Sequence, residues 1–143
     1  MNDKKVKKDI KDAEDYKDKY LRALADYQNF EKRVRQEKEY VAKMAEARII
    51  LKFLPFLDNL EKAEIFIKDQ GLKMIKDQLI QALKQSGVEE LDLQNKEFDP
   101  QYAEAVEVVE GDKDNIVVEV LQKGYLFEGQ LLRPAQVKVS RKK

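Results

Sequence analysis

The sequence predicts an α+β protein with a long, coiled-coil-like N-terminal helix, two short helices and a small C-terminal all-β domain. Three observations support this fold class. Residues 5–54 contain no glycine or proline, an apolar stripe with heptad spacing runs along them, and β-branched residues become frequent after residue 88. We therefore divide the chain into a dimerisation helix with a frayed tail (1–54), a two-helix segment (55–87) and a β domain (88–143).

The composition favours an extended element over a single compact domain. The charged fraction is 39%, whereas globular domains average roughly 25%, and a long helix has enough surface to hold these charges. The 28 basic and 28 acidic residues cancel to a net charge of zero. This balance gives no support for a nucleic-acid or anionic-membrane partner.

The chain contains no cysteine and no histidine, which removes cysteine nucleophiles, the commonest general acid–base and the commonest metal ligand. It also has no glycine-rich phosphate loop and no spacing typical of a metal site. The first twenty residues lack an apolar core, and no stretch approaches the roughly 20 apolar residues that span a bilayer. We expect a cytoplasmic protein that is not an enzyme and has no cofactor, metal, membrane anchor or small-molecule substrate.

The apolar stripe on the long helix is narrow, as in a coiled-coil seam. A helix of about 45 residues is on the order of 70 Å long, and nothing else in the chain could cover it. We therefore predict a homodimer with paired helices. Small and charged residues interrupt the stripe, so its N-terminal half should be only marginally stable. The expected seam residues are Tyr16, Tyr20, Tyr27, Phe30, Val34, Val41, Met44 and Leu51.

The segment that follows predicts two short amphipathic helices. Pro55 is expected to end or kink the long helix. Gly71 is expected to separate the two short helices, and Gly87 to end the second. Two copies of this pair would complete a four-helix bundle at the dimer axis.

The C-terminal segment reads as short strands with period-2 stretches. Gly111, Gly124, Gly129 and Pro134 punctuate it, and residues 110–115 (EGDKDN) form the expected exposed turn.

A basic cluster on the long helix raises the alternative of a DNA-binding dimer. Interleaved acids would repel phosphates and argue against it, so an ion-paired helix face is the default. The basic residues are Lys32, Arg33, Arg35 and Lys38, and the acids are Glu31, Glu37 and Glu39.

Four segments in order give the chain a clear resemblance. They are LADYQNFEKR (24–33), FLPFLDNLEKA (53–63), FDPQYAEAV (98–106) and QKGYLFEGQLLRPAQVKV (122–139), together with the sixteen-residue spacing from Gly71 to Gly87. In these features the chain resembles the GrpE family along nearly its whole length.

The resemblance implies an adenine-nucleotide exchange factor of protein folding and the heat-shock response. Such a protein binds the ATPase domain of a DnaK-type chaperone, opens its cleft and promotes ADP release. The resemblance and the weak stripe together predict a long helix that acts as a thermosensor. A structural coiled-coil adaptor without exchange activity is the alternative.

The family's contact positions fall on nine residues of this chain. For Leu121 and Val139 a place in the β core is an equally good explanation, and Phe66 fits the bundle core as well. Gly124, Arg133 and Pro134 are expected to be structural. The nine residues are Lys32, Arg33, Ile65, Phe66, Phe98, Pro100, Leu121, Gln130 and Val139.

Two positions depart from the family pattern. Ala103 stands where the family commonly has histidine, and Gln130 stands where an arginine is usual. If that arginine pairs with a chaperone acid, the contact is absent here or is made differently.

Overall fold

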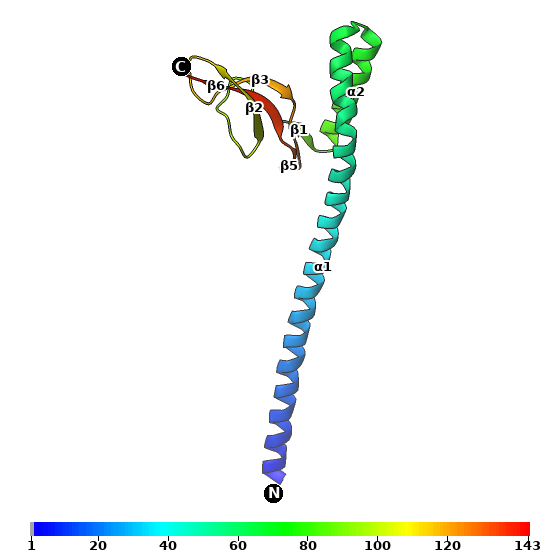
Figure 1. Cartoon of the computed structure of the whole chain (residues 1–143). Coiled ribbons are helices and arrows are strands. Elements are labelled where there is room, and N and C mark those ends of the chain that lie inside the picture. The colour runs from blue at the N-terminus through cyan, green and yellow to red at the C-terminus, as the bar shows by residue number, and fades with distance from the viewer. Residues whose placement is uncertain (1) are drawn as a thin grey trace. The chain divides into compact units, whose positions relative to one another are not determined.

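The computed structural model describes residues 2–143 (Figure 1). The element order is two helices followed by six strands, which confirms the predicted α+β class. The chain divides into two compact units, residues 1–45 and 46–143. We describe each unit by itself.

The first unit is helical throughout its described part, residues 2–45, and belongs to helix α1 (Asn2–Phe66). Its charged surface is partly organised into pairs one turn apart, Arg33–Glu37 and Glu31–Arg35, each at 4.0 Å. Such exposed i,i+4 pairs contribute only a few tenths of a kcal/mol each. The helix of this unit therefore gains little stability from its own surface.

The second unit begins with the C-terminal part of α1, which continues through Pro55 to Phe66. Of the two outcomes predicted at Pro55, an end or a kink, the end does not occur. A proline inside a helix costs about 3 kcal/mol, but its neighbours Leu54 and Leu57 are 0% and 1% exposed. Burying two leucines offsets that cost at roughly 1.5–3 kcal/mol each.

Helix α2 (Gln70–Gln85) begins one residue before Gly71, so the prediction that Gly71 interrupts the helices was wrong. The break lies at residues 67–69. It is set by Asp69, the N-cap, whose Oδ1 accepts a hydrogen bond from the Gly71 amide at 3.1 Å. Gly87, with a φ of 99°, follows the end of α2 and confirms the predicted stop.

The β segment forms two three-stranded sheets rather than one. The first sheet joins β1 (Val88–Glu90), β4 (Tyr125–Phe127) and β5 (Gln130–Arg133) in the order β1-β4-β5, all antiparallel. Glu128 and Gly129, both with positive φ, make the two-residue turn between β4 and β5.

The second sheet joins β2 (Ala103–Glu110), β6 (Ala135–Arg141) and β3 (Val117–Gln122). Its order is β2-β6-β3, with β6 parallel to β2 and antiparallel to β3. The predicted turn at residues 110–115 lies between β2 and β3, which confirms it, and Asn115 adopts a left-handed φ of 62° there.

Two apolar clusters hold the second unit together. One joins the end of α1 to the first sheet and consists of Leu54, Leu57, Val88, Tyr125 and Phe127, with α2 residues packed against it. The other lies within the second sheet and consists of Ala103, Val117, Ala135, Val137 and Val139. The first cluster matters most for function, because it attaches the β domain to the helices.

Candidate functional site

A polar network lies at the junction of α1 with the first sheet. Asp58, on the helix, receives two hydrogen bonds from the Arg133 guanidinium of β5, at 2.6 and 2.7 Å. The two side chains are 14% and 12% exposed. A two-pronged contact of this kind fixes orientation as well as charge. It therefore sets the position of β5 on the helix.

Arg133 has two further contacts that hold its plane in place. Its Nε donates to the carbonyl oxygen of Lys123 at 2.8 Å, and its guanidinium carbon lies 5.3 Å from the centre of the Tyr125 ring. The cation thus has an acid, a carbonyl and an aromatic face as partners. These three partners explain how the positive charge of Arg133 is kept in a place with little water.

A second ion pair stands beside the first. Lys123, between β3 and β4, contacts Glu61 of α1 at 3.0 Å and Glu90 of β1 at 3.2 Å. Partial burial of the ammonium lowers the pKa of Lys123, but the hydrogen bonds and charges of Glu61 and Glu90 outweigh it. The net result is a pKa above the ordinary 10.5. Lys123 is therefore firmly protonated where helix and sheets meet.

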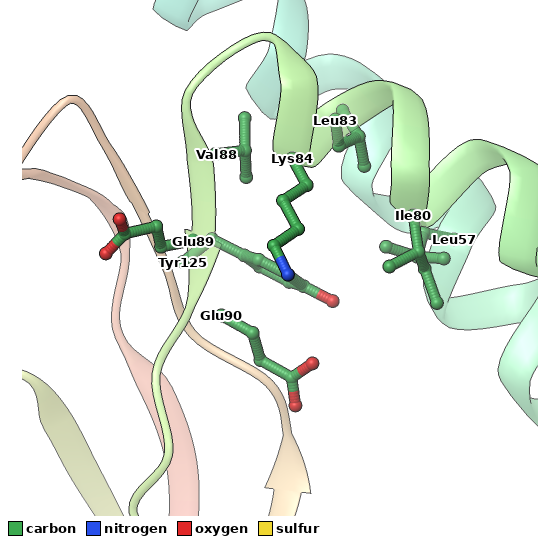
Figure 2. A pocket seen from close by; sticks show the side chains of 8 residues that line it. All are labelled: Leu57, Ile80, Leu83, Lys84, Val88, Glu89, Glu90 and Tyr125. Atoms are coloured by element: carbon green, nitrogen blue, oxygen red, sulfur yellow. The ribbon is translucent and has the colours of Figure 1, made fainter.

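A pocket of about 420 Å³ opens next to this network (Figure 2). Apolar side chains from α1, α2 and β1 and the ring of Tyr125 line it, and Lys84, Glu89 and Glu90 also contribute to the lining. Burial, and then the charges of Glu61 and Glu90, raise the pKa of the Tyr125 hydroxyl above its ordinary 10.0. The phenol therefore keeps its proton at neutral pH.

The predicted contact residues of the β domain separate into exposed and buried ones. Pro100 and Gln130 are exposed, and Leu121 is 45% exposed, so a place in the core does not account for Leu121. Phe98 is half-buried against the second cluster. Val139 is only 7% exposed and belongs to that cluster. For Val139 the burial favours the place in the β core, which the sequence left open beside a partner contact.

The predicted chaperone contacts on the helices lie on the surface of their own units. Lys32 and Arg33 are exposed in the first unit, where Arg33 also lies 5.5 Å from the centre of the Phe30 ring. In the second unit Ile65 is 73% and Phe66 is 85% exposed at the end of α1. Within residues 2–143, both apolar side chains are therefore left largely uncovered.

The eight seam residues have little cover in the single chain. All are exposed except Val34, which is half-buried, with values from 41% for Leu51 to 71% for Tyr16. This exposure is what an unpaired seam would show. The pairing itself stays a prediction.

Sequence reasoning expected Arg133 to be structural but did not foresee its pairing with Asp58. Asp58 belongs to the FLPFLDNLEKA segment and Arg133 to the LLRPA segment, 75 residues apart. A signal was present, because Arg133 is the one charged residue of an otherwise apolar stretch, 131–134, and Asp58 follows directly on the apolar run 53–57. Such charges are seldom buried without a partner. Nothing in the pattern of residues indicated that each was the other's partner.

Ala103, the first departure from the family pattern, is 3% exposed and pairs with Ala135 of β6. Gln130, the second, begins β5 on the surface. Among residues 2–143, no three acidic side chains are grouped as a metal site, and no helix is long and apolar enough to cross a membrane.

Together these features define a class of protein: an α+β protein in which helices with uncovered apolar faces carry a small β domain held by an ion-paired junction. The family model that matches is described as GrpE and covers residues 1–141. The chain belongs to the GrpE family.

Several curated proteins named "Protein GrpE" are similar to this chain over nearly its full length. The one from Clostridioides difficile (strain 630) is 38% identical and the alignment covers 98% of this chain and 72% of the relative. The one from Fusobacterium nucleatum subsp. polymorphum is 40% identical, covering 99% and 74%. The one from Bacillus pumilus (strain SAFR-032) is 41% identical, covering 85% and 71%. These matches confirm the resemblance and, with it, the role of a nucleotide exchange cochaperone for a DnaK-type chaperone.

Proposed function

We propose that this chain promotes ADP release by binding the ATPase domain of a DnaK-type chaperone and holding its cleft open. The observation that carries the proposal is the family match over residues 1–141. Opening requires no proton transfer. It requires that the protein bind the open cleft better than the closed one, and linkage then requires that ADP weaken the binding of this protein.

The β domain supplies the surface that we propose for the chaperone. Pro100, Leu121 and Gln130 are exposed there. Gln130 is uncharged, so a contact through it would be a hydrogen bond and not an ion pair, without the two-pronged geometry of an arginine–carboxylate contact. Val139 is left out of this surface because it is buried. On the helices, the exposed Lys32, Arg33, Ile65 and Phe66 complete the proposed set.

We also propose that the working form is a homodimer. Within the second unit, Leu54 and Leu57 of α1 face the β domain, whereas Ile49, Phe53 and Phe56 are 56%, 56% and 62% exposed. Their spacing of four and three residues puts these three on one side of the helix. An apolar face of this kind is expected to be covered by another helix, and a second copy supplies one.

The experiment that tests this function is release of a fluorescent ADP analogue from a DnaK-type ATPase domain, followed by stopped flow with and without the protein. Acceleration supports the proposal, and unchanged release favours the adaptor without exchange activity. Pro100→Ala with Leu121→Asp should weaken chaperone binding while the dimer persists. Val106→Asp, at a residue 51% exposed on β2, is the matched control. Normal binding by the folded double variant would show that the assigned face is wrong.

Two finer proposals rest on the same function. The long helix acts as a thermosensor, since its charged and small seam residues bury little apolar surface. The protein works in the cytoplasm, where a DnaK-type chaperone meets ATP. Release of the ADP analogue, measured across the melting range of the helix, tests the thermosensor. Fractionation of cells tests the location.

A further inference from the structure

The side chains that link the β domain to α1 form a two-part clamp. Asp58 and Glu61 lie three residues apart and so face the same side of the helix. Asp58 holds Arg133 and Glu61 holds Lys123. Both cations belong to the β domain, so each ion pair crosses from helix to sheet.

The clamp lies next to the surface proposed for the chaperone. Leu121 is followed directly by Gln122 and Lys123. Gln122 donates to Asp58 Oδ2 at 3.4 Å, and Lys123 contacts Glu61 at 3.0 Å. A force applied at Leu121 therefore reaches α1 through the next two residues of the chain. It does not have to pass through the apolar cluster of the second sheet.

The network also differs from the other ion pairs of the β domain. Lys138 of β6 contacts Glu107 at 3.4 Å and Glu119 at 3.3 Å, but all three residues belong to the second sheet. Those pairs join strands within one sheet. Among the ion pairs described for the β domain, those of Arg133 and Lys123 are the ones that reach the helix.

From this geometry we propose that Asp58 and Arg133, assisted by Glu61 and Lys123, are positioning residues. They hold the β domain stiff on α1, so that binding energy at its surface opens the chaperone's cleft instead of bending the junction. This inference rests on the proposed exchange function. Without the clamp the β domain would still bind the chaperone, but part of the coupling between binding and opening would be lost.

The test compares Arg133→Gln with Lys138→Gln as a matched control, because both remove a cation that is paired with carboxylates. The chain lacks cysteine, so spin labels can be attached at Lys62→Cys on α1 and at Asp112→Cys in the turn after β2. Pulsed electron spin resonance then gives the distribution of distances between them. Labelled chains are diluted with unlabelled ones, so that each distance is measured within one chain.

With Lys138→Gln we expect a narrow distribution of distances between the spin labels and an unchanged rate of ADP release. With Arg133→Gln the distribution broadens. The maximal rate of ADP release falls about fivefold or more, at the lower end of typical coupling, while the concentration giving half-maximal rate changes less than about twofold. A residue needed only for folding would lower the active fraction, which circular dichroism measures. That would raise the concentration giving half-maximal rate and leave the maximal rate unchanged.

Either of two results would overturn the proposal: a distribution that stays narrow in Arg133→Gln, or one that broadens while the maximal rate is unchanged. If Arg133→Gln does not fold, Glu61→Gln replaces it. That variant loses the more exposed pair and should show the same two effects, reduced in size; their absence would also refute the clamp. If the parent protein itself fails to accelerate ADP release, the exchange function is refuted, and the distance distributions alone decide whether the clamp exists.

Discussion

At the scale of single residues, Gly124 is the glycine with the least room for a side chain. A Cβ placed on it would lie 2.5 Å from the backbone nitrogen of Ala135 and 2.9 Å from a methyl group of Leu91. The backbone of β6 cannot move aside without disturbing its sheet. We expect Gly124→Ala to lower the free energy of unfolding by about 1–3 kcal/mol.

Urea denaturation at one fixed protein concentration measures this change. Gly71→Ala is the matched control, because a Cβ there meets Asp69 at an ordinary 3.6 Å. The control should raise the free energy of unfolding by up to about 1 kcal/mol, since alanine favours the helix. Equal effects of the two substitutions would contradict the proposed crowding at Gly124.

The junction also predicts how stability depends on pH. The pKa values of Tyr125 and Lys123 are raised above 10.0 and 10.5 in the folded protein. Above pH 10 the unfolded chain releases these protons before the folded one does, so stability is complete below that pH and falls as the pH rises further. The pKa of Lys138 is also raised, so its titration too lowers stability as the pH rises.

Tyr125→Phe should reduce the loss of stability above pH 10 without abolishing it, because the two lysines still titrate. Urea midpoints measured from pH 8 upward give the slope of stability against pH, for the parent protein and for the variant. An identical slope would mean that the Tyr125 hydroxyl titrates alike in the folded and unfolded chains. Tyr102→Phe, for which no comparable junction contact exists among the described interactions, is the reference substitution.

At the scale of elements, the two parts of α1 differ in what stabilises them. The first unit has exposed side chains and weak surface ion pairs, whereas the second buries Leu54 and Leu57 against the β domain. Local stabilities should differ accordingly. We predict that the helix of residues 2–45 melts in a separate, lower-temperature transition.

Glu37 interrupts the apolar stripe between Val34 and Val41. Tyr27→Leu with Glu37→Leu should raise the first transition and leave the second nearly unchanged, because leucine buries more apolar area at the seam. Circular dichroism during heating measures both. Arg22→Leu with Glu39→Leu, placed away from the stripe, controls for helix propensity. A single transition that moves as a whole would refute this separation.

The same elements show where sequence patterns succeed. Heptad spacing and β-branched residues predicted the helix and the strands, because these signals are local. Pro55 and Gly71 misled the prediction of helix ends, because what outweighs them is not local. Leu54 and Leu57 hold the helix through Pro55, and the Asp69 cap places the start of α2 before Gly71.

At the scale of the whole molecule, we predict a dimer held partly by the exposed face of Ile49, Phe53 and Phe56. Phe53→Glu with Phe56→Glu should give a monomer at micromolar concentration, because four charges would face one another across the two chains. Lys62→Glu, also exposed on α1, should remain dimeric. Analytical sedimentation decides between these states, and a monomeric parent protein would contradict both the seam and the bundle.

The candidate site was the hardest part to predict at this scale. The exposed Pro100 and Leu121 could be named because their segments resemble a family. The Asp58–Arg133 pair could not, because a contact between residues 75 apart is decided by the tertiary fold. The parallel pairing of β2 with β6 was missed for the same reason, since period-2 patterns carry no information about strand order.

The place of β6 in its sheet also constrains the order in which the protein is made. β6 is the central strand, and β2 and β3 pair with it and not with each other. A ribosome that has released residues 103–122 has therefore released two strands that have no partner in this sheet. Their buried residues Ala103 and Val117 have to wait for residues 135–141 to leave the exit tunnel. The helices can form earlier, because their hydrogen bonds are local. During synthesis, the nascent β domain is thus itself an unfolded segment of the kind that chaperones bind.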